Sequence, residues 1–160
     1  RAGGAVALIR HTDAPGGAGD PAGFDLDDCG TQRNLSERGR QEAVALGVAF
    51  KARDVPVARV LSSPWCRCLD TARLMDVGAV EVAGTFGNAF VLADQRETLT
   101  EGGRALIADW QGPGTLVVVT HGANILALTG VRPAQGEVVV VAPEPGGFAE
   151  VGRFRAASSV

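Results

Sequence analysis

Both histidines of the chain stand at the end of an apolar run, where a side chain can take part in chemistry. Residues 5–9 are apolar and lead into Arg10 and His11, and the run at residues 116–119 leads to His121. Short runs rich in Val and Ile are typical of strands that are buried on both faces of a parallel sheet. Ligands of open α/β sheets bind just beyond the carboxyl ends of such strands, so we expect both imidazoles to border one crevice.

A third element is expected to bring a second arginine to this crevice. The turn from the next strand into a helix is predicted at Ser63 and Pro64, with Ser63 as the N-cap and Pro64 at the first helical position. Arg67 then lies in the first helical turn, where free backbone N–H groups and the helix dipole favour an anion.

Two guanidinium groups beside two imidazoles predict phosphoryl transfer. Arginine offers planar, bidentate donors to phosphate oxygens. A neutral imidazole is a competent nucleophile, and neighbouring arginine cations lower its pKa and keep it neutral. We therefore expect phosphoryl-transfer chemistry in which His11 is the reactive residue and the arginines bind the phosphate, without a metal or a cofactor.

The rest of the pattern predicts an α/β fold with a mostly parallel central sheet between helices, a three-layer sandwich. Ser36 is expected to cap a helix that runs to about Arg53 and buries Ala43, Leu46, Gly47 and Phe50. Further strands are predicted at residues 57–61, 80–83, 138–141 and 148–154, and further helices at residues 97–110 and 123–129. Trp65 and Phe90 are assigned to the core, with a place in a pocket lining as the alternative.

The segment from Asp13 to Asn34 is too long for an ordinary connection, and loops of this length are usually functional or disordered. Because it follows His11 directly, we expect it to form a wall of the crevice. Thr12, Arg33 and Gly122 lie beside that crevice and are the candidate substrate-binding residues. For Arg33 a surface role is favoured over contact with the substrate.

The bulk composition predicts a single globular domain over residues 1–160. The chain is 46% hydrophobic and 21% charged, and its net charge of −3 argues against nucleic acid as a partner. No stretch approaches the roughly 20 apolar residues of a membrane span. The chain opens at Arg1 without a signal peptide, which is compatible with a leader that was removed.

Three cysteines, Cys29, Cys66 and Cys68, lack the spacing of a zinc or thioredoxin-like site. Cys66 and Cys68 lie two apart on the predicted helix and point in different directions, so they do not readily bridge each other. A bond from Cys29 to either of them would require an oxidising compartment. The alternative is three buried thiols in a cytoplasmic protein.

Five short segments together resemble the histidine phosphatase superfamily, which includes phosphoglycerate mutases, short phosphohistidine phosphatases and general phosphatases. The segments follow one another in the family's order at residues 8–12, 35–39, 62–67, 71–72 and 119–122. The resemblance implies an α/β sandwich in which His11 becomes phosphorylated while Arg10, Arg67 and His121 hold the phosphate. The surroundings of Cys29 and Cys66 are similar to those in exported bacterial phosphatases, including a lipopolysaccharide core heptose phosphatase group, which implies a periplasmic or secreted location.

The chain also departs from the family pattern. Thr12 stands where the family usually has Gly, and the region around Asn88 lacks the Glu that donates a proton in mutase-like members. Asp94 is the nearest carboxylate in that loop and is our candidate acid. Glu97 is the first alternative, and Asp27 or Asp28 in the first loop is the second.

These observations predict a phosphoric monoester hydrolase that works through a phosphohistidine on His11. Its substrate is expected to be a small phosphorylated molecule such as a sugar phosphate or a lipopolysaccharide core phosphate. One alternative is an inactive phospholigand-binding protein of the same fold, which Thr12 and the missing Glu would permit. A mutase-type phosphotransferase fits less well, because the chain is short of the cap that a mutase needs. A dinucleotide-binding domain is disfavoured because no G-x-G-x-x-G follows the first strand.

Overall fold

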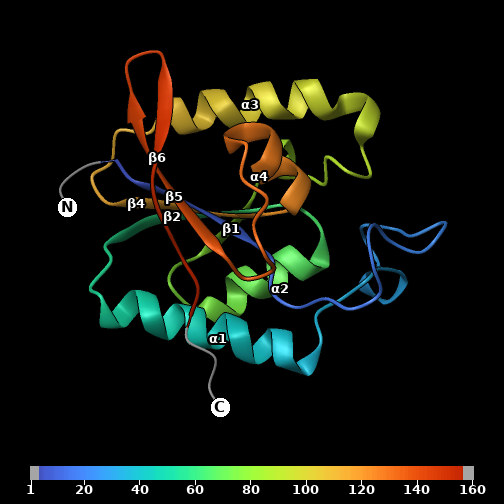
Figure 1. The fold of residues 1–160 in the computed structure, drawn as a ribbon. Helices are drawn as coiled ribbons and strands as arrows, with labels where there is room; N and C mark the ends of the chain where they lie inside the picture. The colour runs from blue at the N-terminus through green and yellow to red at the C-terminus, as the bar shows by residue number, and fades with distance from the viewer. Residues whose placement is uncertain (1–3, 157–160) are drawn as a thin grey trace.

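The fold is centred on one mixed sheet, which a computed structural model describes over residues 4–156. Within these residues the sheet has six strands in the order β3-β2-β4-β1-β5-β6 (Figure 1). The strands β1, β2, β3 and β4 are parallel, and β5 and β6 complete one edge in antiparallel pairing. Their bounds are β1 Val6–Arg10, β2 Val57–Ser62, β3 Val80–Val82, β4 Thr115–Thr120, β5 Val138–Glu144 and β6 Gly147–Phe154.

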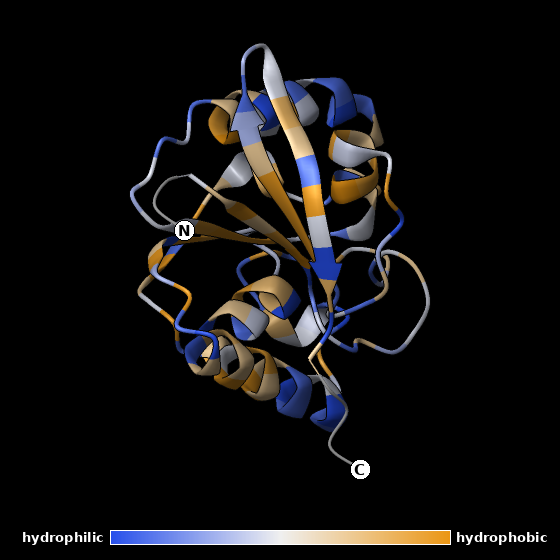
Figure 2. Ribbon diagram, turned by 60° about the vertical axis from the view of Figure 1, so that its left-hand side comes forward, coloured by the Kyte–Doolittle hydropathy of each residue, from blue (hydrophilic) through white to orange (hydrophobic). Residues whose placement is uncertain are grey.

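Helices cover both faces of the sheet, as the sequence predicts. Helices α1 (Glu37–Ala52) and α2 (Cys66–Met75) lie on one side, and α3 (Arg96–Ala108) and α4 (Gly122–Thr129) lie on the other (Figures 1 and 2). Three short 3-10 turns, η1 (Cys29–Thr31), η2 (Gly84–Phe86) and η3 (Ala93–Gln95), lie in the connections of the described chain. No helix in residues 4–156 is long and apolar enough to cross a membrane.

The central strands are apolar throughout because they contribute to two cores at once. In β1, Val6 and Leu8 pack with residues of α3 and α4, whereas Ala7 and Ile9 pack with residues of α1 and α2. Strand β4 is buried along its whole length in the same way. This double burial explains why neither strand alternates apolar and polar residues.

The start of α1 is confirmed, and so is its buried stripe. The Ser36 hydroxyl accepts a hydrogen bond from the Gly39 N–H at 2.9 Å, which is the expected N-cap. The predicted stripe of α1 is buried, and its Gly47 is required because a Cβ there would overlap the Met75 carbonyl of α2. The backbones of helices α1 and α2 are therefore in direct contact at Gly47.

The predicted start of α2 is wrong. The helix begins at Cys66, with Trp65 rather than Ser63 in the N-cap position. The Ser63 hydroxyl accepts from the Trp65 N–H at 3.2 Å, just before the helix, and also makes a tertiary contact at 2.7 Å with Nε2 of His121. The first turn of α2 receives a different partner, because the Gln32 side-chain oxygen accepts from the Cys66 N–H at 3.0 Å.

Candidate active site

The carboxyl ends of β1 and β4 bring the two histidines together. The strands are adjacent and parallel, with Arg10 opposite Thr120, so the residues that follow them emerge at the same edge of the sheet. The backbone N–H of His11 donates to the Thr120 carbonyl at 3.1 Å. The imidazole rings of His11 and His121 are 5.7 Å apart between centroids, and both residues are buried. The expected meeting of the two imidazoles is confirmed.

The main chain fixes the tautomer of His11. Its Nδ1 atom lies 2.9 Å from the carbonyl oxygen of Thr12. A carbonyl oxygen only accepts hydrogen bonds, so Nδ1 must carry the ring proton. Nε2 is therefore left with its lone pair, which is the form a nucleophile requires.

The surroundings also keep His11 uncharged. Burial is the largest cause that lowers the pKa of His11 from 6.5 to about 3, and the charges of Arg67, Arg10 and Arg33 lower it further. The hydrogen bond to Thr12 acts in the opposite direction but is outweighed. The imidazole is consequently neutral at physiological pH.

Arg10 and Arg67 present buried donors with no acceptor. The Nε–H groups of both side chains are shielded from solvent and find no hydrogen-bond partner among the described residues. The rest of Arg10 is held in place, with Nη1 donating to the Pro133 carbonyl at 2.9 Å. A buried unpaired donor costs about 1–3 kcal/mol, and an oxyanion in the pocket would supply the missing acceptors.

Asp20 is a site residue that the sequence analysis does not single out. Its Oδ1 atom accepts from Nη1 of Arg67 at 2.7 Å, and both side chains are fully excluded from solvent. Asp20 also accepts from the Trp65 indole at 2.9 Å and from the Arg33 backbone N–H at 3.1 Å. Burial raises the pKa of Asp20, but hydrogen bonds from Arg67, the Arg33 N–H and Trp65 outweigh it and hold the pKa below its ordinary value.

No local signal separates Asp20 from the other acidic residues of the first loop. Only its ion pair with Arg67 of α2 identifies Asp20 as a site residue.

Arg33 lies in the lining of the pocket, as expected for a candidate substrate-binding residue. Its Nε donates to the Gly19 carbonyl at 2.9 Å and its Nη1 donates to the Ala14 carbonyl. Arg33 thereby folds the Gly-rich segment over the histidines.

These groups line a pocket of about 200 Å³. Of the predicted site residues, Arg10, His11, Arg33, Arg67, His121 and Gly122 line it. The first loop supplies one wall through residues 17–19, as expected. Phe90 lines it too and is 55% exposed, so its assignment to the core is wrong.

Two predicted site residues lie outside the pocket lining. Thr12 is buried, and its N–H and hydroxyl approach the Thr71 hydroxyl at 3.2 and 3.3 Å. Thr12 therefore positions His11 through its carbonyl oxygen. Asp94 lies on η3 and is exposed, and no carboxylate is among the residues that line the pocket. The alternatives Glu97, Asp27 and Asp28 are exposed as well.

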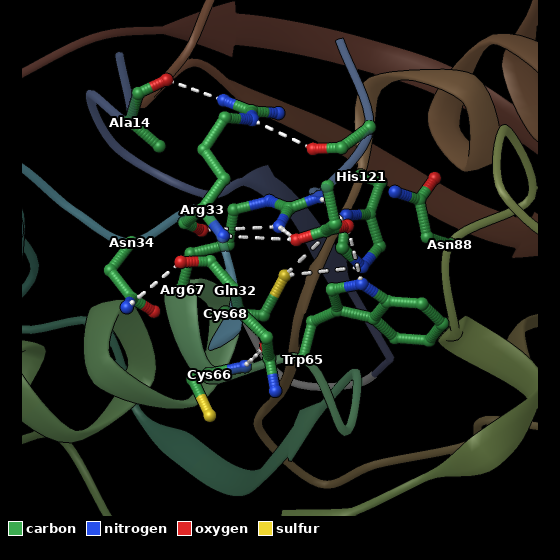
Figure 3. A network of polar contacts seen from close by, with 12 residues as sticks. Ala14, Gln32, Arg33, Asn34, Trp65, Cys66, Arg67, Cys68, Asn88 and His121 are labelled. Atoms are coloured by element: carbon green, nitrogen blue, oxygen red, sulfur yellow. Dashed lines mark hydrogen bonds and ion pairs between the residues drawn. The ribbon is translucent and has the colours of Figure 1, made fainter. Parts of the chain in front are cut away.

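His121 lines the pocket and also belongs to a closely packed cluster of polar side chains (Figure 3). Its Nε2 atom is 2.7 Å from the Ser63 hydroxyl and 3.5 Å from Sγ of Cys68, and the Trp65 ring meets it edge-on. Burial is the largest cause that holds the pKa of His121 well below its usual value, and the charges of Arg67, Arg33 and Arg10 lower that pKa further. Burial raises the pKa of Cys68 to about 12, so its thiol stays protonated and is no nucleophile.

The disulfide joins Cys29 to Cys66, with the Cα atoms 5.8 Å apart, and Cys68 is the free thiol. The sequence left open whether Cys29 pairs with Cys66 or with Cys68, and the structure has the bond to Cys66. The bond ties the first loop to the residue before Arg67.

Among the described residues, no group of three His, Cys, Asp or Glu side chains is arranged to hold a metal ion.

The tautomer and the charge of His11 can be tested by NMR. We expect long-range ¹H–¹⁵N spectra to show a protonated Nδ1 and a bare Nε2 for His11, unchanged between about pH 5 and 8. In the unfolded chain the ring takes up a proton near pH 6.5, whereas the folded protein excludes it down to about pH 3. Stability should therefore fall as the pH drops below about 6.5. A His121→Asn variant isolates the His11 signal, and a midpoint near 6.5 in the folded protein would contradict the assignment.

The comparisons with known proteins agree with this geometry. Residues 7–83 match the family model described as the histidine phosphatase superfamily (branch 1). A search of curated proteins finds no match. The solved structure of the protein histidine phosphatase SixA in complex with tungstate is similar at 20% identity and a TM-score of 0.63, with 95% of this chain and 97% of that chain covered.

Two further solved structures have the same fold. One is a phosphoserine phosphatase from Entamoeba histolytica in complex with 3-phosphoglyceric acid, at 16% identity and a TM-score of 0.64, over 93% of this chain and 95% of that chain. The other is a mycobacterial glucosyl-3-phosphoglycerate phosphatase, at 19% identity and a TM-score of 0.60, over 87% of this chain and 90% of that chain. The family match covers His11 and Arg67, and the fold match extends through β4 and His121. The chain is therefore similar to the histidine phosphatase superfamily over residues 7–83, and it shares its fold with solved structures of phosphatases.

Proposed function

We propose that this protein is a phosphatase that hydrolyses phosphomonoesters through a phosphohistidine on His11. The main support is that the unprotonated Nε2 atom of His11 lies in the same pocket as Arg10 and Arg67. The Nε–H groups of these two arginines are buried and have no hydrogen-bond partner among the described residues. A nucleophile with its lone pair free and cationic donors without acceptors suit an incoming phosphoryl group.

The reaction has two balanced steps. In the first, the Nε2 lone pair forms a bond to phosphorus, the P–O bond to the leaving group breaks, and the leaving oxygen takes up a proton. The Nδ1–H···O=C contact with Thr12 stabilises the positive charge that develops on the ring. In the second, water attacks phosphorus, the P–N bond breaks, and inorganic phosphate and bare Nε2 are restored.

The intermediate can be trapped directly. We expect rapid quenching with p-nitrophenyl [³²P]phosphate to yield an acid-labile, base-stable label on the wild-type protein and none on His11→Gln. His121→Gln is the matched control, because it changes the other imidazole and leaves the nucleophile in place. It should still be labelled, with turnover reduced on the order of 10²-fold as for the loss of one oxyanion donor. A label that persists in His11→Gln would rule out the proposed nucleophile.

The leaving group must leave without help from a carboxylic acid in the pocket lining. We therefore expect turnover to fall steeply from p-nitrophenyl phosphate to a sugar phosphate, because an alkoxide needs a proton in the transition state. Asp94→Asn should change neither rate by more than about twofold, given its exposed position on η3. A selective loss of 10-fold or more on the sugar phosphate would instead establish Asp94 as the acid.

A phosphohistidine-bearing substrate is a second candidate, and the same observation favours it. The distal nitrogen of a phosphorylated imidazole takes its proton from solvent, so this leaving group does not require a carboxylic acid from the protein. The likeness to the protein histidine phosphatase SixA points in the same direction. Hydrolysis of free phosphohistidine at a rate well above that of a sugar phosphate would support it.

We further propose that the protein works in an oxidising compartment, either periplasmic or secreted. The Cys29–Cys66 disulfide supports this, since such bonds persist mainly outside the cytosol. Protein made in an oxidising compartment and then denatured should show one titratable thiol, that of Cys68. Reduction should cost about 3–4 kcal/mol of unfolding free energy by the chain-entropy relation for a closure of this length. Three titratable thiols would refute the bond.

A further inference from the structure

A second, larger hollow opens beside the pocket of His11, and we call it the arginine groove. Its volume is about 560 Å³, and it lies between α4, the start of α3 and the segment after α4. It shares four lining residues with the pocket, so the two are continuous. The residues that line the groove are Arg10, Phe90, Arg96, Gly122, Ala123, Leu126, Ala127, Arg132 and Pro133.

The groove concentrates positive charge on a protein whose net charge is −3. Three of its lining residues are arginines and none is acidic. Within residues 4–156, neither Arg96 nor Arg132 forms an ion pair or a side-chain hydrogen bond. Four other surface arginines of the chain do pair with a carboxylate, and these pairs are Arg38–Glu42, Arg40–Glu37, Arg59–Glu81 and Arg153–Glu150.

The position of Arg96 adds a second argument. It is the first residue of α3, a 13-residue helix whose N-terminal end carries positive dipole potential. A cation is disfavoured there; Glu97 also lies in this first turn, but neither it nor any other carboxylate of the described chain forms an ion pair with Arg96. The same place favours an anion, because the dipole and the guanidinium then act together.

The remainder of the groove is apolar. Leu126 and Ala127 of α4 and the ring of Phe90 line it together with Arg10, which it shares with the pocket of His11, and the two outer arginines. A ligand that fits this composition has a carbon skeleton near Phe90 and an oxyanion at the far end. The volume lies within the range of small-molecule sites.

We propose that the arginine groove binds the leaving-group half of the substrate, and that this half carries a second oxyanion held by Arg96 and Arg132. The proposal rests on the proposed function and narrows its substrate class to phosphomonoesters with a second carboxylate or phosphate. The phosphoryl group occupies the pocket of His11, the carbon skeleton crosses the wall shared with Phe90, and the second anion meets the outer arginines.

Binding of non-hydrolysable phosphonates tests this class independently of turnover. We expect 4-carboxybenzylphosphonate to bind the wild-type protein about 10-fold or more tighter than benzylphosphonate, since hydrogen bonds to charged groups have effects of this size. Arg96→Gln and Arg132→Gln should each remove most of that preference. A xylylene bisphosphonate in place of the carboxylate compound shows whether carboxylate or phosphate is preferred. Isothermal titration calorimetry gives the affinities.

Arg104→Gln is the matched control. It neutralises an exposed arginine of α3 that stacks over Phe148 and does not line the groove, so the preference should persist. Equal binding of the two phosphonates, no binding of either, or a preference unchanged in both Arg96→Gln and Arg132→Gln would overturn the proposal. The phosphatase assignment fails separately, if p-nitrophenyl phosphate is not hydrolysed while the phosphonates still bind.

Discussion

The buried ion pair between Asp20 and Arg67 is the interaction on which the site depends. A guanidinium wholly excluded from water is expensive unless a carboxylate compensates its charge, and removal of one partner from such a pair typically costs about 3–5 kcal/mol. Asp20 compensates Arg67 and is itself satisfied by the Trp65 indole and the Arg33 N–H. The pair thus connects the first loop to α2 and leaves the Nε–H of Arg67 free for a ligand.

Asp20 compensates only one of the arginines around the pocket, so an excess of positive charge remains there. Arg10 and Arg33 line the same space, and burial together with the charge of Arg67 lowers the pKa of each below its ordinary value. Burial is the main cause that keeps His11 neutral, and these cations both lower its pKa further and attract an anion. The neutral imidazole of His11 and the excess of positive charge beside it therefore arise from one arrangement of buried groups.

Local patterns predicted the parts of this structure that local physics determines. Double burial of β1 and β4 shows in their apolar runs, and strand ends locate His11 and His121. Asp20 was missed because its partner is 47 residues away in the chain. Ser63 has the composition of a cap but is drawn to His121 by a tertiary contact. Phe90 reads as core by its hydropathy alone, whereas its exposure depends on how the loop after β3 lies across the sheet edge.

The contact that sets the His11 tautomer uses only main-chain atoms of residue 12. The backbone there is itself fixed, because the Gly136 N–H approaches the carbonyl oxygens of Arg10 and His11 at 3.0 and 3.1 Å. The side chain at position 12 is accordingly not required to orient the ring. The Thr12 side chain instead packs against Thr71, so the atoms that set the tautomer and the atoms that fill the space beside α2 are separate parts of one residue.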